Sequence, residues 1–133
     1  MFFCARQQVI NALHQVVTSP DHRPASIAVF FDAEYEQWVD GNRLCYNDFL
    51  HHMALLKQVT RSMSLTILAA AAQGDDVLTH HRVDVEKRDG ARSTIEVFAH
   101  FTLRNQRIYR CSELTRLVDG AGDDADLGSR VSA

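Results

Sequence analysis

Apolar and polar positions recur with two different periods along this chain, and the change of period separates helices from strands. In residues 2–18, apolar side chains return every three or four residues, which is the spacing of one face of a helix. Ser19 and Pro20 end this helix because proline cannot continue it. A linker is expected over 19–25, and residues 25–31 suit either a helical turn or a strand.

A short hairpin and a second long helix are predicted next. Residues 33–39 alternate in polarity, 40–42 carry a turn signal, and 44–46 suit a short returning strand. Asn47 is a good N-cap for the following helix, because its side chain can accept a hydrogen bond from a free backbone N–H. His52 lies on the apolar face of this helix, where it is either a core histidine or part of a pocket wall.

Four strands complete the predicted domain. Alternating runs cover 64–72, 77–87, 94–103 and 107–118, and short separators rich in Gly, Asp and Asn divide them. Such separators indicate an antiparallel meander. Two helices cannot cover both faces of this sheet, so we expect them on one face with a pocket between the layers. The sequence therefore predicts an α+β domain over residues 1–118, with a curved, mostly antiparallel sheet wrapped around N-terminal helices.

Residues 119–133 differ from the rest of the chain in composition. They hold four aspartates, three glycines and one arginine, so this segment carries the net charge of −3 and the preceding body is neutral. A neutral body lacks the basic patch that binds phosphates, and we expect no nucleic-acid partner. The scarcity of apolar residues predicts a mobile acidic tail.

The cysteines and the absence of familiar motifs narrow the class of protein further. Cys4, Cys45 and Cys111 are odd in number and irregular in spacing, which favours a reduced, cytoplasmic protein over a disulfide-stapled secreted one. No run approaches the ~18 apolar residues of a membrane span, so no membrane partner is expected. Metal-binding spacings and glycine-rich phosphate loops are missing, and the sequence predicts neither a metal nor a cofactor.

Two parts of the chain resemble a known class of proteins. Tyr35–Gly41 and Asn47–His52 are similar to the first-strand and helix region of SnoaL-like proteins, which are nuclear transport factor 2-like. Residues 77–89, Phe101–Ile108 and Glu113–Arg116 resemble their three terminal strands. The resemblance implies a cystatin-like cone with a central pocket, and it extends distantly to limonene-epoxide-hydrolase-like and ketosteroid-isomerase-like members. This fold hosts isomerases, cyclases, epoxide hydrolases, dehydratases and non-catalytic modules.

A finer resemblance suggests site residues. Limonene-epoxide-hydrolase-like members place an Arg-x-Asp pair and a second carboxylate in the pocket, and Arg82, Asp84 and Glu113 match these positions. The resemblance implies that Glu113 is the base, that Asp84 is the acid, and that Arg82 separates their proton affinities. Tyr35 and Gln37 match a pair that positions water, although Gln replaces the usual Asn, and Glu113 replaces an Asp.

The alternation of the strand also allows a different interpretation of that site. Arg82 and Asp84 could be a solvated pair on the outer face, with Val83 and Val85 packed inward. Two functions therefore stay open. One is cofactor-free hydrolysis, hydration or isomerisation of a small apolar substrate. The other is a non-catalytic module that binds a small ligand or another protein.

The sheet face opposite the helices predicts an oligomer. It carries Glu96, Phe98 and His100, a mixed rather than fully polar set. Because two helices leave this face uncovered, we expect a second copy to pack on it and form a homodimer through the sheet face.

Overall fold

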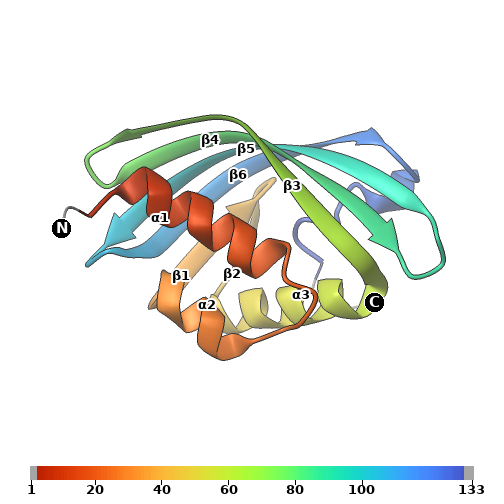
Figure 1. The fold of residues 1–133 in the computed structure, drawn as a ribbon, viewed down its shortest axis with the longest axis horizontal. Helices are drawn as coiled ribbons and strands as arrows, with labels where there is room; N and C mark the ends of the chain where they lie inside the picture. The colour runs from red at the N-terminus through yellow and green to blue at the C-terminus, as the bar shows by residue number, and fades with distance from the viewer. Residues whose placement is uncertain (1–2, 131–133) are drawn as a thin grey trace.

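A computed structural model describes residues 3–130 and shows one curved sheet with helices α1 and α3 against its concave side (Figure 1). The strand order is β2-β1-β6-β5-β4-β3, and neighbours are antiparallel except β1 and β6, which are parallel. The predicted α+β fold is confirmed. The strands are β1 (Phe31–Val39), β2 (Asn42–Leu44), β3 (Thr60–Gln73), β4 (Asp76–Lys87), β5 (Arg92–Arg104) and β6 (Arg107–Asp119).

The helices follow the predicted order with changes at their ends. The first predicted helix begins at Ala5 and changes to a π-helix at Leu13. Phe3 and Cys4, which were predicted to be helical, precede it, and position 2 lies outside the described residues. The ambiguous segment is a helix that begins at Pro24, where the missing N–H of proline costs no hydrogen bond. The helices are α1 (Ala5–Ala12), the π-helix η1 (Leu13–Val17), α2 (Pro24–Phe30), α3 (Tyr46–Val59) and a 3-10 turn, η2 (Gly122–Asp124).

Two predictions around the start of α3 are wrong. The N-cap is Cys45 rather than Asn47, because the Asp48 carboxylate accepts a hydrogen bond from the Cys45 backbone N–H at 3.1 Å. This is the acidic half of a capping box, and the helix begins at Tyr46, two residues earlier than predicted. The returning strand correspondingly ends at Leu44 instead of running over 44–46.

The core lies between the concave face of the sheet and the helices. Alternate residues of β5 supply much of the core, as predicted from their spacing. Each large apolar side chain buried in this way stabilises the fold by about 1.5–3 kcal/mol. Phe31, Tyr35 and Phe49 form an aromatic cluster with ring centroids 4.7–5.1 Å apart. This cluster fixes β1 against α3 and sets the position of Tyr35.

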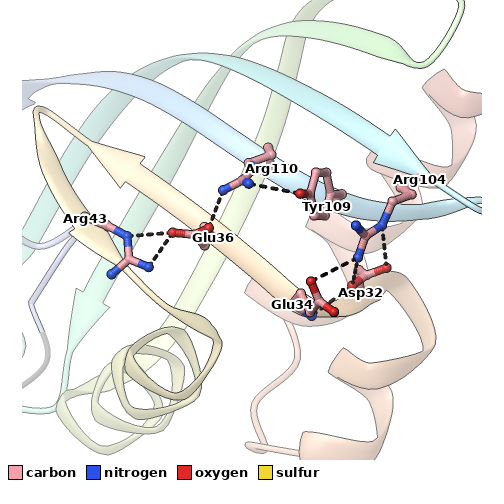
Figure 2. Close-up of polar contacts among 7 residues, drawn as sticks. All are labelled: Asp32, Glu34, Glu36, Arg43, Arg104, Tyr109 and Arg110. Carbon is pink, nitrogen blue, oxygen red and sulfur yellow. Dashed lines mark hydrogen bonds and ion pairs between the residues drawn. The ribbon is translucent and has the colours of Figure 1, made fainter.

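The outer side of β1 is tied to β2, β5 and β6 by arginines (Figure 2). Glu36 accepts from Arg110 on β6 and pairs with Arg43 on β2 at 2.5 Å. Arg104 pairs with Asp32 at 2.9 Å, and its guanidinium lies 3.9 Å from the centroid of the Tyr109 ring. Exposed ion pairs contribute little each, so we interpret this network as fixing the register of the parallel pair more than as a source of stability.

The middle of the outer face carries uncovered apolar side chains. Leu78, Phe98 and Leu114 are 57%, 53% and 68% exposed. The strand register sets Phe98 opposite both His80 and Leu114, and the His80 ring stacks on Phe98 with centroids 4.1 Å apart. A contiguous apolar patch of this kind is typical of an interaction surface.

The segment after β6 packs on the domain, contrary to the mobile tail that we expected. We call Gly120–Arg130 the C-terminal strap; residues 131–133 lie outside the described part of the chain. Asp124 is only 1% exposed and forms an ion pair with Lys87 Nζ at 2.6 Å. Leu127 is equally buried and joins the hydrophobic core. The prediction from composition was wrong because it could not include the contacts of one ion pair and one buried leucine, which attach this segment to the domain.

Candidate functional site

A cavity of about 120 Å³ lies between the concave face of the sheet and the helices. Its wall is mostly apolar, and an apolar cavity of about 150 Å³ is known to hold a benzene molecule. The cavity thus suits a ligand about the size of a six-membered ring. Strands β1 and β3 to β6, helices α1 and α3, η1 and the strap all contribute to the wall. The polar side chains in it are Tyr35, Gln37, His52, His81, Glu113 and Thr115.

Among the residues that the structure describes, Glu113 is the one carboxylic acid in this wall. It lies on β6 opposite Ala99 of β5 and Val39 of β1, which offer it no polar side chain. Among the described residues no side chain donates a hydrogen bond to its carboxyl or pairs with it. Burial, together with the negative charge of Asp40, raises the pKa of the Glu113 carboxyl to about 8. At neutral pH this group is therefore mainly protonated.

Tyr35 and Gln37 form a fixed polar pair beside it. The Tyr35 hydroxyl donates a hydrogen bond to Gln37 Oε1 at 2.5 Å, and both side chains are buried. In this orientation the amide N–H groups of Gln37 are its remaining donors. Burial raises the pKa of Tyr35, and the charges of Cys111 and Glu113 raise it further. Tyr35, Cys111 and Glu113 are therefore close enough to influence one another's proton affinity.

Two histidines in the cavity wall are neutral at physiological pH. His52 on α3 donates from Nδ1 to the backbone carbonyl of Arg130 at 2.8 Å, and burial lowers its pKa despite that bond. His81 on β4 lies with Nδ1 3.0 Å from Thr79 Oγ1. Burial, helped by the charge of His80, lowers the pKa of His81 to about 4. Both imidazoles can donate or accept a hydrogen bond without carrying charge.

Arg82 and Asp84 lie on the outer face of the sheet and not in the cavity. Their side chains are 44% and 43% exposed, with Arg82 Nε 3.6 Å from Asp84 Oδ2. Asp84 also accepts a hydrogen bond from Thr94 at 2.7 Å. The inward positions of β4 are taken by Val83 and Val85, whose burial decides which way the strand faces. The expected convergence of Arg82 and Asp84 with Glu113 is not found.

The remaining candidates do meet in one place. Tyr35, Gln37 and His52 line the same cavity as Glu113, while their roles in positioning water or substrate stay predictions. His81 is a wall residue that the sequence interpretation did not select. The signal that could have found it is the alternation of β4, since the face that buries Val77 and Val85 also carries residue 81.

Comparison with known proteins bears on the fold. No protein-family model matches the chain. The LEH-like epoxide hydrolase of M. tuberculosis superimposes with a TM-score of 0.70 at 15% identity, over 94% of this chain and 88% of that one. The chain has the nuclear transport factor 2-like (SnoaL-like) fold. IdmH, a putative polyketide cyclase of Streptomyces antibioticus, shares the SnoaL-like fold with a TM-score of 0.70 at 12% identity, over 93% and 96% of the two chains.

Two further matches complete the comparison. A protein of ketosteroid isomerase-like fold from Catenulispora acidiphila, solved with trimethylamine, gives a TM-score of 0.66 at 15% identity over 79% and 82% of the chains. In sequence, the chain is 28% identical over 123 residues to the uncharacterized protein C11D3.04c of Schizosaccharomyces pombe, covering 92% of this chain and 95% of that protein. The structural matches show the fold, and none of these similarities assigns a reaction.

The described residues offer little for other kinds of site. Residues 3–130 contain no group of three or more His, Cys, Asp or Glu side chains placed to hold a metal ion. Within the same range, no helix has the length and apolar character needed to cross a membrane. The polar groups that line the cavity include a protonated carboxyl, two neutral imidazoles and an amide, in mostly apolar surroundings.

Proposed function

We propose that this protein binds a small, neutral, mostly apolar organic molecule in the cavity and that Glu113 transfers protons on it without a cofactor. The observation that carries the proposal is the Glu113 carboxyl, which lies in an apolar wall with its pKa raised to about 8. A group with a pKa near the working pH can both give and take a proton, which is the requirement for general acid–base catalysis.

A single carboxyl favours isomerisation among the reactions considered. The carboxylate removes a proton from a carbon next to a carbonyl group, and the resulting acid returns that proton to another atom of the same molecule. The Gln37 amide can donate a hydrogen bond to the oxygen on which negative charge develops. Hydrolysis through two carboxylates is less well supported, because Asp84 lies on the outer face.

Proton exchange of a small ketone tests the proposal. Cyclohexanone in D₂O exchanges the protons next to its carbonyl group, and proton NMR follows their loss. We expect the wild type to accelerate this exchange, with an inflection near pH 8 that reports the ionisation of Glu113. Glu113→Gln should slow exchange by about 10²–10⁴-fold, which is the usual contribution of a general acid or base.

Asp84→Asn is the matched control. It also replaces a carboxylate by an amide, but on the outer face, and should leave the exchange rate unchanged. Exchange at the uncatalysed rate in the presence of wild type, or equal rates for wild type and Glu113→Gln, would contradict proton transfer by Glu113.

A second candidate function is ligand binding without catalysis. It is favoured by one observation, namely that Glu113 alone of the three expected catalytic residues lines the cavity. In that case the protonated carboxyl serves as a hydrogen-bond donor to a neutral oxygen atom of the ligand. Saturable binding of cyclohexanone without accelerated exchange would support this function over the first.

A further inference from the structure

The C-terminal strap forms part of the cavity wall. Leu127 and Gly128 line the cavity, and Leu127 is 2% exposed. In Figure 1 the C-terminal strap runs from the end of β6 into the space between the sheet and α3. Any molecule in the cavity is therefore enclosed partly by a segment that lies outside the sheet and the long helices.

The first half of the strap is firmly attached to the sheet. At Gly120, φ is +126°, and an added Cβ would lie 2.3 Å from Ser93 Oγ, so only glycine lets the chain turn this close to β5. Asp124 then accepts a hydrogen bond from Ser93 Oγ at 2.5 Å and pairs with Lys87 at 2.6 Å. The Asp124 carboxylate is almost fully buried, so this attachment resists separation, because pulling the carboxylate away would cost it its cationic partner inside the protein.

The second half is attached in a different way. Leu127 is held by apolar contact with the cavity wall, and the carbonyl of Arg130 accepts the hydrogen bond from His52. Both His52 and Leu127 face the cavity, so this half depends on what the cavity contains.

We propose that Leu127–Arg130 is the gate of the cavity, that it opens about the fixed anchor at Asp124, and that Leu127 sets the greatest length of ligand that can be enclosed. The inference rests on the proposed function in one respect, since it takes the cavity to hold a neutral ligand. It adds a specificity-determining residue and restricts the ligand class to molecules near the size of a single six-membered ring.

Two ketones that differ in length test the role of Leu127. NMR titration of the full chain compares cyclohexanone with 4-propylcyclohexanone. We expect wild type to bind cyclohexanone at least tenfold more tightly, because the propyl group meets Leu127. Leu127→Ala removes about three carbon atoms and should shift the ratio of the two affinities by tenfold or more towards the longer ketone. Leu127→Met, which nearly conserves volume, should keep the wild-type preference.

Leu114→Ala is the control, because it makes the same change on the exposed outer face, where the leucine is 68% exposed. It should leave the preference unchanged. An unchanged preference in a folded Leu127→Ala variant would overturn the assignment of Leu127.

Hydrogen exchange tests the gate without any ligand, so failure of the gate and failure of the proposed function can be told apart. Amides of residues 127–130 should exchange at least tenfold faster than those of Arg92–Arg104 in β5. Equal protection of the two segments would overturn the gate. Absence of binding of both ketones to wild type, with fast exchange at 127–130, would instead contradict the proposed function and keep the gate.

Discussion

Replacing Glu113 by glutamine should stabilise the protein at neutral pH and have no such effect in acid. The folded carboxyl has a pKa of about 8, against 4.5 for an ordinary glutamate. Between these values the folded state holds a proton that the unfolded state has lost, so wild-type stability falls as the pH rises through this window. Below pH 4 the side chain is protonated in both states, so this loss of stability disappears. Glutamine is neutral at every pH, so Glu113→Gln does not suffer the loss.

The size of the effect follows from the shift in pKa. At 1.36 kcal/mol for each pKa unit, keeping Glu113 protonated at pH 7 costs roughly 3 kcal/mol of the free energy of unfolding. Glu113 is only partly buried, so this figure is an upper limit. For a domain of this length the melting temperature of Glu113→Gln should rise by up to roughly 10 °C at pH 7.

Thermal unfolding followed by circular dichroism from pH 4 to pH 9 measures this difference. Glu34→Gln is the control, because Glu34 is 78% exposed on β1 and its replacement should change stability little at any pH. A constant difference between Glu113→Gln and wild type across the whole pH range would refute the reasoning. It would mean that the carboxyl ionises at no cost, and the case for Glu113 as a proton-transfer group would fall with it.

Three other outcomes are expected. Asp124→Ala should lower the free energy of unfolding by about 3–5 kcal/mol in chemical denaturation, because it removes a buried carboxylate that pairs with Lys87 and accepts from Ser93. A loss below 1 kcal/mol would mean that the strap is not anchored there. We propose that the outer face forms the homodimer. Leu114→Arg should then convert the dimer into a ~15 kDa monomer in sedimentation, because it places a charge in the interface. A wild type that is monomeric at micromolar concentration would contradict the proposal. Arg82→Ala and Asp84→Ala should each leave the NMR titration of the Glu113 carboxyl unchanged, and a shift in its pKa would restore the three-residue site.

The sequence was most informative where one face of an element is plainly apolar. The alternation in β5 predicts its buried face, and the separators predict the meander, because burial of every second residue determines the register of a strand. It was least informative for β4, where polar residues stand on both faces. There the resemblance selected Arg82 and Asp84, while the burial of Val83 and Val85 turned the other face inward.

The strap could not be predicted for a different reason. Its attachment depends on Asp124 meeting Lys87 and Ser93, residues that are distant in sequence and are brought together only by the folded sheet. Local composition, which counts glycines and aspartates, contains no record of such a contact. Glu113 could be selected from sequence, but its raised pKa arises from the surrounding cavity wall and required the structure.

The strand order leaves β3 at one edge of the sheet, paired on one side with β4. This strand is fourteen residues long and has no charged residue between Ser62 and Gln73. Edge strands of soluble proteins usually carry lysines, prolines or bulges that prevent them from adding to another sheet. β3 has irregularities between Thr60 and Ser62 and between Ile67 and Ala69, and four consecutive alanines then precede Gln73, its last residue. At high concentration, molecules of this protein should therefore associate edge to edge through β3. A lysine placed in the alanine run is the substitution that should prevent this association.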